Sequence, residues 1–324
     1  MGGAMIQNSS PVVLLGASGT IGRAVLRELL SRGVAVRCPL RARPDDLPDH
    51  PNLCITLGDL QDTGLQAQVM TGASRIISCL ASRSGAPKDA WNVEYGLNSL
   101  WLKAALSAEV RQFILLSALC VQRPELAFQQ AKLAFEADLQ ASGLTWTIVR
   151  PTAFFKSLSG QMERLRNGKP FLVFGDGRLT ACKPISDSDL ARYLVDSLHD
   201  PERANRILPI GGPGPAETPA EQGEALAQAL GVPLKIRHVP VAFLDVIIAV
   251  LSVAGWVSPR ARDKAELARI GKHYATRSML VWDPQTSTYS DEATPETGLD
   301  RLETYYRQLA SGEAVLDRGD HAVF

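Results

Sequence analysis

The sequence predicts an α/β fold built on a doubly wound parallel sheet, with a smaller substrate lobe in its C-terminal half. Short apolar runs alternate with helical patterns through the first half of the 324 residues. A glycine-rich turn joins the first apolar run to the first helix, and the alternation loosens beyond about residue 155. We therefore expect a sheet domain at residues 1–154 and a lobe mainly at 155–324, with some of its segments returning to the sheet.

The first strand, turn and helix indicate what the sheet binds. Val12–Leu15 is apolar throughout, as in a strand buried on both faces, and it leads into a G-x-x-G-x-x-G turn and an amphipathic helix. Gly16 permits a tight turn, Gly19 lets backbone N–H groups approach a pyrophosphate, and Gly22 lets the helix pack close to the strand. A glycine triplet also suits a plain structural turn, but its flanks favour a Rossmann-type dinucleotide site. The expected cofactor contacts here are Gly16, Ser18, Gly19, Thr20, Ile21 and Gly22.

The remaining elements follow from the same patterns. Further strands are expected at residues 34–36, 53–57, 76–80, 113–117 and 145–149, with helices between them at 64–70, 98–108 and 127–139. In the second half we expect helices at residues 217–230, 263–271 and 299–309 and a short strand at 234–238. Because ligands of such sheets lie beyond the carboxyl ends of the strands, the residues that follow each strand are the candidates for chemistry.

Composition excludes several classes of protein. The 34 basic and 34 acidic residues balance, so no basic field is available for nucleic acid. The five cysteines are scattered without a C-x-x-C pair, which argues against zinc, iron–sulfur and disulfide frameworks. The first ten residues lack the features of a signal or transit peptide. We expect a bacterial chain in a reducing, cytoplasmic compartment, with no bound metal.

One apolar segment tests that localisation. Residues 239–257 are strongly apolar but are interrupted by Asp245 and are barely long enough to span a bilayer. We expect a buried or surface-lying helix of the substrate lobe rather than a transmembrane span. Such a helix can cover a ligand or rest on a membrane surface.

The end of the second expected strand indicates which nicotinamide cofactor binds. Arginines follow it and no carboxylate precedes Asp45, which favours the 2′-phosphate of NADPH over the free ribose hydroxyl of NADH. Arg41 is the main candidate, with Arg37 or Arg43 in support. Asp59, after the third strand, is placed either to contact the adenine or to cap a turn. Beyond the fourth strand, Leu80, Ala81, Ser82 and Arg83 should line the ribose and nicotinamide side.

The fifth strand and the helix after it carry a modified catalytic pattern. In short-chain dehydrogenase/reductases a Ser at this place accompanies a Y-x-x-x-K pair, whose Tyr protonates a carbonyl oxygen while the Lys holds the nicotinamide ribose. Ser117 and Lys132 match that pattern, but Phe128 stands where the Tyr would be. A phenylalanine cannot donate a proton. Either catalysis is lost, or the reaction forms no alkoxide.

The chain resembles the atypical short-chain reductases, and among them the family of NADPH-dependent 8-vinyl-reductases of chlorophyll and bacteriochlorophyll synthesis. The most specific matching motifs are R-P-T-A-F-F-K-S, C-K-P-I-S and L-P-I-G-G-P-G, at residues 150–157, 182–186 and 208–214. Other matching stretches are residues 78–83, 115–118, 128–133, 174–177 and 218–223. The likeness runs from about residue 12 to 306. Plant members carry a transit segment that this chain lacks, which implies a phototrophic bacterium and a place in the cytoplasm or at the periphery of photosynthetic membranes.

The resemblance accounts for the missing tyrosine. In that family hydride is added to a vinyl carbon, so negative charge spreads into a conjugated macrocycle and no oxyanion needs an acid. It implies that Lys132 and Ser117 are the catalytic residues, with Lys132 holding the ribose, and that Pro151 and Thr152 contact the cofactor. The substrate would be a magnesium tetrapyrrole with a free propionate, namely divinyl chlorophyllide or protochlorophyllide.

The substrate side and the proton source stay open from the residues alone. Apolar wall is expected from Phe154, Phe155, Leu158 and Met162, and a cation for the propionate from Arg83, Lys156 or Lys183. The proton donor is water, Tyr95, Cys120 or Lys156. His238 and His273 are not expected to bind magnesium. Two other functions remain compatible with the sequence: a reductase of another enone or quinone, and a non-catalytic NADP(H)-sensing regulator or assembly factor.

Overall fold

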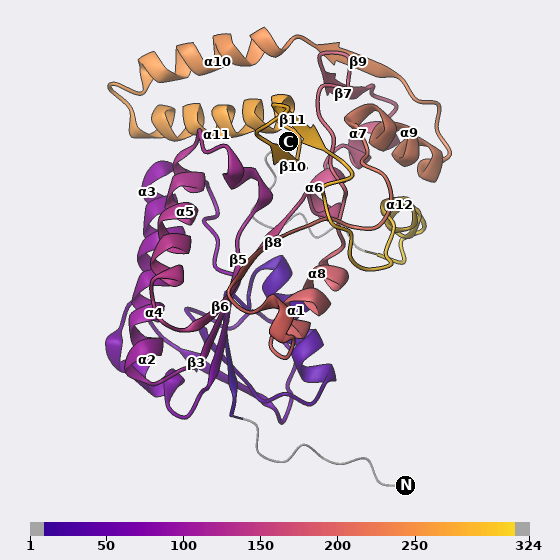
Figure 1. The fold of residues 1–324 in the computed structure, drawn as a ribbon. Helices are drawn as coiled ribbons and strands as arrows, with labels where there is room; N and C mark the ends of the chain where they lie inside the picture. The colour runs from indigo at the N-terminus through magenta and orange to yellow at the C-terminus, as the bar shows by residue number, and fades with distance from the viewer. Residues whose placement is uncertain (1–9, 315–324) are drawn as a thin grey trace, which may run out of the picture.

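The computed structural model describes residues 10–314, so the N-terminal segment considered above lies outside it. Within those residues seven strands form one parallel sheet in the order β3-β2-β1-β4-β5-β6-β8 (Figure 1). They are β1 (Val12–Leu15), β2 (Val36–Leu40), β3 (Leu53–Leu57), β4 (Arg75–Ser78), β5 (Gln112–Leu116), β6 (Thr145–Pro151) and β8 (Arg206–Ile210). The predicted α/β fold with a Rossmann-type sheet is confirmed.

Helices cover both faces of this sheet, and the buried side chains alternate accordingly. Val12 and Leu14 of β1 pack toward α1 (Thr20–Ser31) and α8 (Asp187–Asp196), whereas Val13 and Leu15 pack toward the opposite face. That opposite face is covered by α2 (Thr63–Met70), α4 (Asn98–Ser107) and α5 (Ala127–Gln140). A strand buried on both sides has no polar face, which is why these strands read as continuous apolar runs.

The second half of the chain adds smaller units beyond the sheet edge. A third apolar cluster joins the short helices α6 (Phe155–Leu158) and α7 (Met162–Arg166) to α9 (Pro219–Leu230) and α12 (Leu302–Ser311). Beside them lie the strand pair β7 (Phe171–Phe174) and β9 (Ile236–Val239) and the hairpin β10 (Val281–Asp283) and β11 (Thr288–Ser290). Two 3-10 turns are η2 (Leu119–Gln122) and η3 (Pro201–Arg203). The division of the chain at residue 154 stays a prediction, since β8 and α8 lie beyond it yet join the sheet and its cover.

One local expectation was wrong, and two elements were not predicted. The second strand was expected at residues 34–36, but β2 begins at Val36 and continues through Arg37 to Leu40. The guanidinium of Arg37 donates to the carbonyl of Val69 (2.8 Å) and to that of Thr71, at the end of α2, so a charged residue is accommodated inside the sheet. The helix expected from residue 98 is preceded by the short helix α3 (Pro87–Ala90) and a seven-residue π-helix, η1 (Trp91–Leu97), that no pattern indicated.

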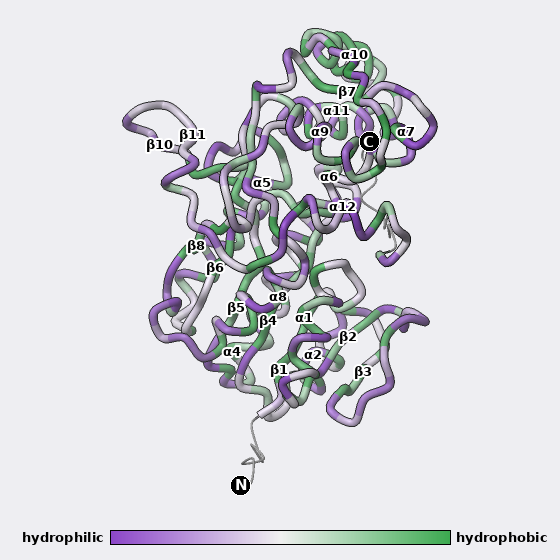
Figure 2. Tube along the Cα trace, turned by 90° about the vertical axis from the view of Figure 1, so that its right-hand side faces the viewer, coloured by the Kyte–Doolittle hydropathy of each residue, from purple (hydrophilic) through white to green (hydrophobic). Residues whose placement is uncertain are grey.

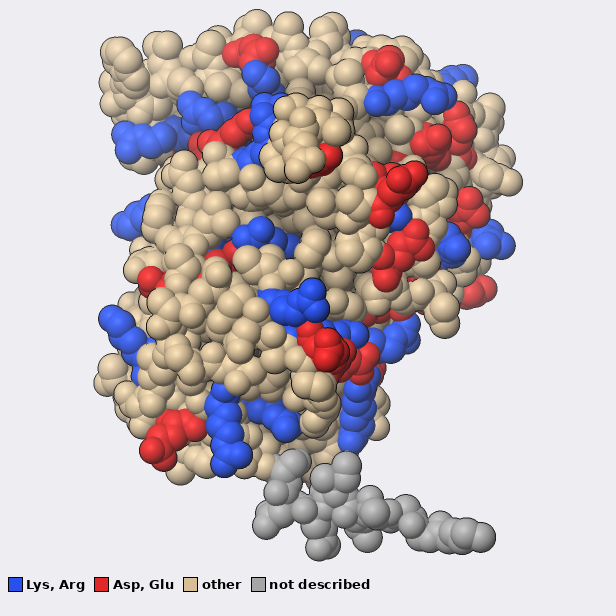
Figure 3. All heavy atoms as spheres, in the orientation of Figure 1, with Lys and Arg blue, Asp and Glu red and all other residues tan. Residues whose placement is uncertain are grey.

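The apolar segment 239–257 forms a helix that lies on the surface. α10 (Val241–Ala254) pairs with α11 (Pro259–Thr276) in a hairpin at one end of the molecule (Figures 1 and 2), and in α10 only Leu244 is buried. No helix among residues 10–314 is both long and apolar enough to cross a membrane. Elsewhere, on the face drawn in Figure 3, acidic and basic side chains are mixed.

Candidate active site

The glycine turn forms a backbone cradle at the carboxyl end of β1. Gly16 has φ +77°, and a Cβ there would lie 2.6 Å from the carbonyl oxygen of Cys79. A Cβ on Gly22 would lie only 2.0 Å from the carbonyl oxygen of Gly16. At Gly19, by contrast, the nearest such atom is 3.4 Å away. The protein itself therefore requires glycine at positions 16 and 22, whereas at 19 it leaves room that a close-lying ligand can use.

The start of α1 presents unpaired donors to the same place. Its N-cap, Gly19, supplies no side-chain acceptor, and the first turn of the helix contains no carboxylate. The first N–H groups of a helix without such a cap form an anion site. Lys156, at the start of α6, adds a cation: its Nζ donates to Thr20 Oγ1 at 2.9 Å. These residues fit a dinucleotide pyrophosphate, and they bring Lys156 to the cofactor side of the site.

The arginines after β2 have separate surroundings. Arg41 is exposed and, within the part of the chain that the structure describes, makes no hydrogen bond or ion pair. Arg43 is ion-paired with Asp49, and Arg37 points to α2 as described above, so the supporting role expected for Arg37 does not hold. Asp59 Oδ1 accepts from the N–H of Gln61 at 3.0 Å, as a turn aspartate does. Of the expected 2′-phosphate residues, Arg41 is the one left available.

The side chains of Ser117 and Phe128 both contact other groups of the protein. The Ser117 hydroxyl donates to Glu136 Oε1, and the same buried carboxylate forms an ion pair with the partly buried Arg150 of β6. Phe128 lies in an apolar cluster that includes Cys120 and Ile270. The position that carries an acid in the tyrosine-containing pattern is thus filled by packed hydrocarbon.

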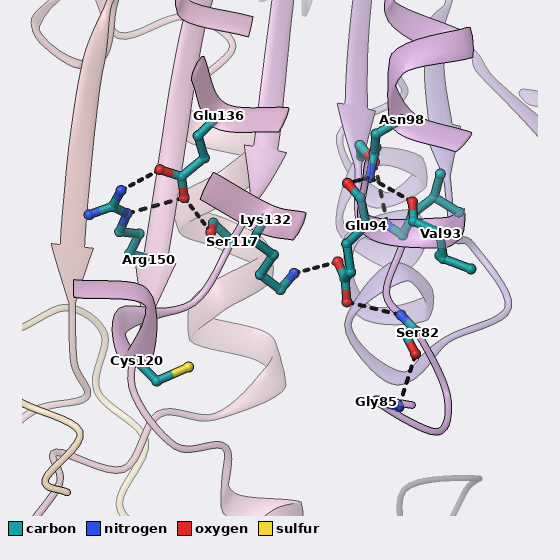
Figure 4. A network of polar contacts seen from close by, with 12 residues as sticks. Ser82, Gly85, Val93, Glu94, Asn98, Ser117, Cys120, Lys132, Glu136 and Arg150 are labelled. Atoms are coloured by element: carbon teal, nitrogen blue, oxygen red, sulfur yellow. Dashed lines mark hydrogen bonds and ion pairs between the residues drawn. The ribbon is translucent and has the colours of Figure 1, made fainter. Parts of the chain in front are cut away.

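Lys132 is held by a buried carboxylate that sequence reasoning missed. Its Nζ donates to Glu94 Oε2 at 2.7 Å, and the two residues are only 9% and 4% exposed. Glu94 Oε1 accepts from the N–H of Ser82 at 3.0 Å, in the segment after β4 expected to line the nicotinamide side. In Figure 4 the two side chains point toward one another from α5 and η1. The lysine, the carboxylate and the Ser82 segment therefore form one unit.

That unit is extended by a second carboxylate. Asp89 Oδ2 accepts from the hydroxyls of Ser82 (2.6 Å) and Ser84 (2.8 Å) and from the N–H of Ser84 (3.2 Å). Although burial opposes it, these hydrogen bonds lower the pKa of Asp89. Leu80 is buried and Ala81 is exposed in the same segment. The chain after β4 is consequently fixed from two sides.

The residues expected on the substrate side do not converge on one point. Phe155 is buried against Tyr305 with 5.6 Å between ring centroids, and Phe154 is half-buried beside the sheet. Lys183 is buried and forms ion pairs with Glu296 (2.8 Å) and Asp291 (2.9 Å). Burial would lower the pKa of Lys183, but these two carboxylates raise it. Arg83 is exposed in the segment after Ser82.

The remaining candidates have the following surroundings. Thr152 donates its N–H to the carbonyl of Ile210 (3.0 Å), and Pro151 is buried at the end of β6. Burial raises the pKa of the Cys120 thiol, which lies 3.7 Å from the Tyr274 hydroxyl. Tyr95 is half-buried on η1.

The two histidines contact protein groups. Nδ1 of His238 is 2.9 Å from the carbonyl oxygen of Gly175, and Nε2 of His273 is 3.0 Å from the amide nitrogen of Gln129. Among residues 10–314 no cluster of three metal-ligating side chains occurs.

The chain is similar in sequence and in fold to known proteins. Residues 16–201 match a family model described as NAD(P)H-binding. The divinyl chlorophyllide a 8-vinyl-reductase of Oryza sativa subsp. indica is 45% identical over 98% of this chain and 83% of its own length. A photosystem II assembly factor of Cyanophora paradoxa is 28% identical over 72% of this chain and 73% of its own. The solved structure of MoeE5 with UDP-glucose and NAD superposes with a TM-score of 0.69 over 94% of this chain and all of its own, at 20% identity, a likeness of fold.

The two glycines of the cradle give a matched pair of substitutions. We expect Gly22→Ala to lower the free energy of unfolding by about 3 kcal/mol, because its Cβ overlaps the Gly16 carbonyl. We expect Gly19→Ala to change that free energy by less than about 0.5 kcal/mol, as for an exposed site. Gly19→Ala should nevertheless weaken binding of the reduced dinucleotide roughly tenfold, the loss of about one hydrogen bond. Urea unfolding and calorimetric titration measure both. Unchanged dinucleotide affinity in Gly19→Ala would contradict the placement of the pyrophosphate at this glycine turn.

Arg41 provides a test of cofactor choice. We expect Arg41→Asp to weaken NADPH binding roughly 100-fold, since a charge-assisted contact is replaced by repulsion. NADH, which lacks the 2′-phosphate, should be affected much less. Arg43→Asp is the matched control, because Arg43 is already paired with Asp49. Equal losses of NADPH and NADH affinity in Arg41→Asp would contradict the assignment.

Proposed function

The chain belongs to the divinyl chlorophyllide a 8-vinyl-reductase family, and from this membership we propose that it reduces the 8-vinyl group of a divinyl chlorophyllide or protochlorophyllide to ethyl in chlorophyll biosynthesis. The reductant is NADPH, which supplies a hydride and leaves as NADP⁺. A proton completes the ethyl group. The observation that carries this proposal is the near-full-length identity to the reductases, together with a site that keeps the ribose-binding lysine but packs a phenylalanine in place of the acid.

The alternatives have weaker support. The assembly factors share less identity with this chain than the reductases do and cover less of it. A carbonyl reductase needs an acid near the developing alkoxide, and Phe128 is buried among apolar side chains. A conjugated vinyl group makes no such demand, because its macrocycle accepts the electron pair. The chain's own contribution is then to bind, orient and exclude water.

Named residues can perform these tasks. The backbone of residues 16–22 and the ammonium of Lys156 are suited to the pyrophosphate, and Arg41 to the 2′-phosphate. Lys132 has one of its three N–H donors on Glu94, which leaves two for ribose hydroxyls. We keep Arg83, which is exposed in the segment after Ser82, as the cation for the pigment's propionate, whereas Lys183 is buried between two carboxylates.

We further propose that the α10–α11 hairpin docks on an anionic membrane surface. Phe243, Val246, Val250, Val253 and Val257 recur at intervals of three and four along one side and are 57–89% exposed. Trp256, next to Val257 at the tip, is 86% exposed. Three exposed basic residues, Arg260, Arg262 and Lys264, follow at once. An apolar stripe with a tryptophan and a basic flank is the pattern of an interfacial helix, and a pigment substrate partitions into the same surface.

Turnover tests the reaction directly. With NADPH and divinyl chlorophyllide, we expect the wild-type protein to shift the Soret band to shorter wavelength as the vinyl conjugation is lost. Lys132→Met should raise the KM for NADPH. Phe128→Tyr should not raise kcat, because no acid is missing; a missing general acid would show as a gain of roughly 100-fold. No spectral change with wild type, or a large gain with Phe128→Tyr, would refute the proposed reaction.

Vesicle sedimentation tests the docking surface. We expect the wild-type protein to co-sediment with phosphatidylglycerol vesicles and far less with phosphatidylcholine alone. The double change Val250→Glu and Val253→Glu should reduce the bound fraction at least tenfold, since two side chains are no longer transferred from water. Leu57→Glu with Leu299→Glu is the control, because these leucines are 57% and 85% exposed, against 63% and 69% for Val250 and Val253, but lie outside the hairpin. Equal loss in both double variants would rule out a specific role for α10.

A further inference from the structure

The Lys132–Glu94 pair has a feature that ribose binding alone does not require. A lysine that only holds ribose hydroxyls needs no carboxylate, and burying two charges costs several kcal/mol that their attraction only partly recovers. Here both charged groups are almost fully enclosed. The positive charge of Lys132 and the negative charge of Glu94 together make a neutral pair. The resemblance to short-chain reductases puts the nicotinamide half of the cofactor at this place.

The backbone around Glu94 is built to hold this arrangement. Glu94 lies in the π-helix η1, and π-helical turns are rare and concentrate at functional sites. The side-chain amide of Asn98 donates to the carbonyls of Val93 (3.3 Å) and Glu94 (3.0 Å) (Figure 4). The side-chain oxygen of Asn98 accepts from Ser78 Oγ at 2.6 Å. Asn98 thereby fastens the wide turn to the end of β4. Glu94 is aimed at Lys132 by a dedicated set of contacts.

The charge of Lys132 acts on thiols beyond the carboxyl ends of two neighbouring strands, β4 and β5. Burial raises the pKa of Cys79, directly after β4, to about 12, and the Lys132 charge opposes that rise. Burial also raises the pKa of the Cys120 thiol, beyond β5, and the Lys132 charge opposes that rise as well. Glu94, whose Oε2 lies 2.7 Å from the Lys132 ammonium, is the carboxylate placed to offset this charge.

Charge balance matters for hydride donation. Loss of hydride leaves a nicotinamide ring with one positive charge, which an uncompensated lysine beside it would destabilise. We propose that Glu94 is a positioning residue that orients Lys132 and cancels its charge beside the nicotinamide half of the cofactor, so that the site does not disfavour the oxidised cofactor. This inference rests on the proposed function for the direction of hydride transfer. Its test uses no pigment, so it can fail independently of the vinyl reduction.

The experiment compares the dissociation constants of NADP⁺ and NADPH by calorimetric titration. In Glu94→Gln, which keeps the shape but leaves Lys132 uncompensated, we expect the ratio Kd(NADP⁺)/Kd(NADPH) to rise roughly tenfold, the size expected for one unit charge several ångströms away at a protein-like dielectric. Glu94→Asp keeps the charge and should leave the ratio near that of wild type. Lys132→Met, which leaves Glu94 alone, should move the ratio in the opposite direction.

Two controls separate charge balance from loop structure. Asp89→Asn removes a carboxylate that fixes the same Ser82 segment without contacting Lys132, and we expect it to leave the ratio unchanged. The double change Glu94→Gln with Lys132→Met restores neutrality and should return the ratio toward wild type even if both affinities fall. An unchanged ratio in Glu94→Gln, or an equal rise in Asp89→Asn, would overturn the proposal. If Glu94→Gln does not fold, as judged by circular dichroism, the opposite shift in Lys132→Met decides it.

Discussion

The close approach of Gly22 to the carbonyl of Gly16 is the constraint on which the site depends. Because no side chain separates them, α1 starts directly above the end of β1 and its first N–H groups face the edge of the sheet. The turn is closed from the other side by the backbone of Cys79, which leaves no room for a Cβ at Gly16. The cradle is therefore made of backbone held by β1, β4 and α1 together. Its shape is a consequence of packing in the sheet core.

Around this cradle the buried charges are satisfied in pairs. Glu136 joins Arg150 and Ser117 across β5, β6 and α5, and Glu94 joins Lys132 and Ser82 across η1, α5 and the end of β4. Each carboxylate accepts from two different elements, so each fixes the relative position of strands and helices that flank the site. Because an unpaired buried charge is costly, these contacts favour a single arrangement. Glu94 fixes α5 at Lys132, and Glu136, four residues later on the same helix, fixes α5 to Arg150 of β6 and to Ser117.

Much of this could be predicted from the sequence, for reasons that are local. The glycine spacing, the apolar strands and the positions of Lys132 and Phe128 follow from patterns within a few residues of one another. The contact between Glu94 and Lys132 could not be predicted, because it joins residues 38 positions apart through a π-helix that depends on Asn98 and Ser78. The partners of Lys183 lie still farther along the chain, near its C-terminal end. Arg37 was expected to support cofactor binding because the predicted strand ended at residue 36 and placed Arg37 just after it. The structure places Arg37 inside β2, with its guanidinium hydrogen-bonded to the carbonyls of Val69 and Thr71.

Phe128 lies where α5 packs against α11 of the surface hairpin. Its cluster includes Ile270 of α11, and the same helix accepts the N–H of Ala127 through Glu266 and meets Gln129 through His273. The first turn of α5, which leads to Lys132, is thus fastened to α11, and α11 to the exposed stripe of α10. A tyrosine at position 128 would add a hydroxyl to this apolar cluster, where burial is costly unless the hydroxyl is hydrogen-bonded. Hydrocarbon at position 128 therefore has two consequences: it suits a substrate that absorbs its own negative charge, and it lets α11 of the hairpin pack against α5, the helix that carries Lys132.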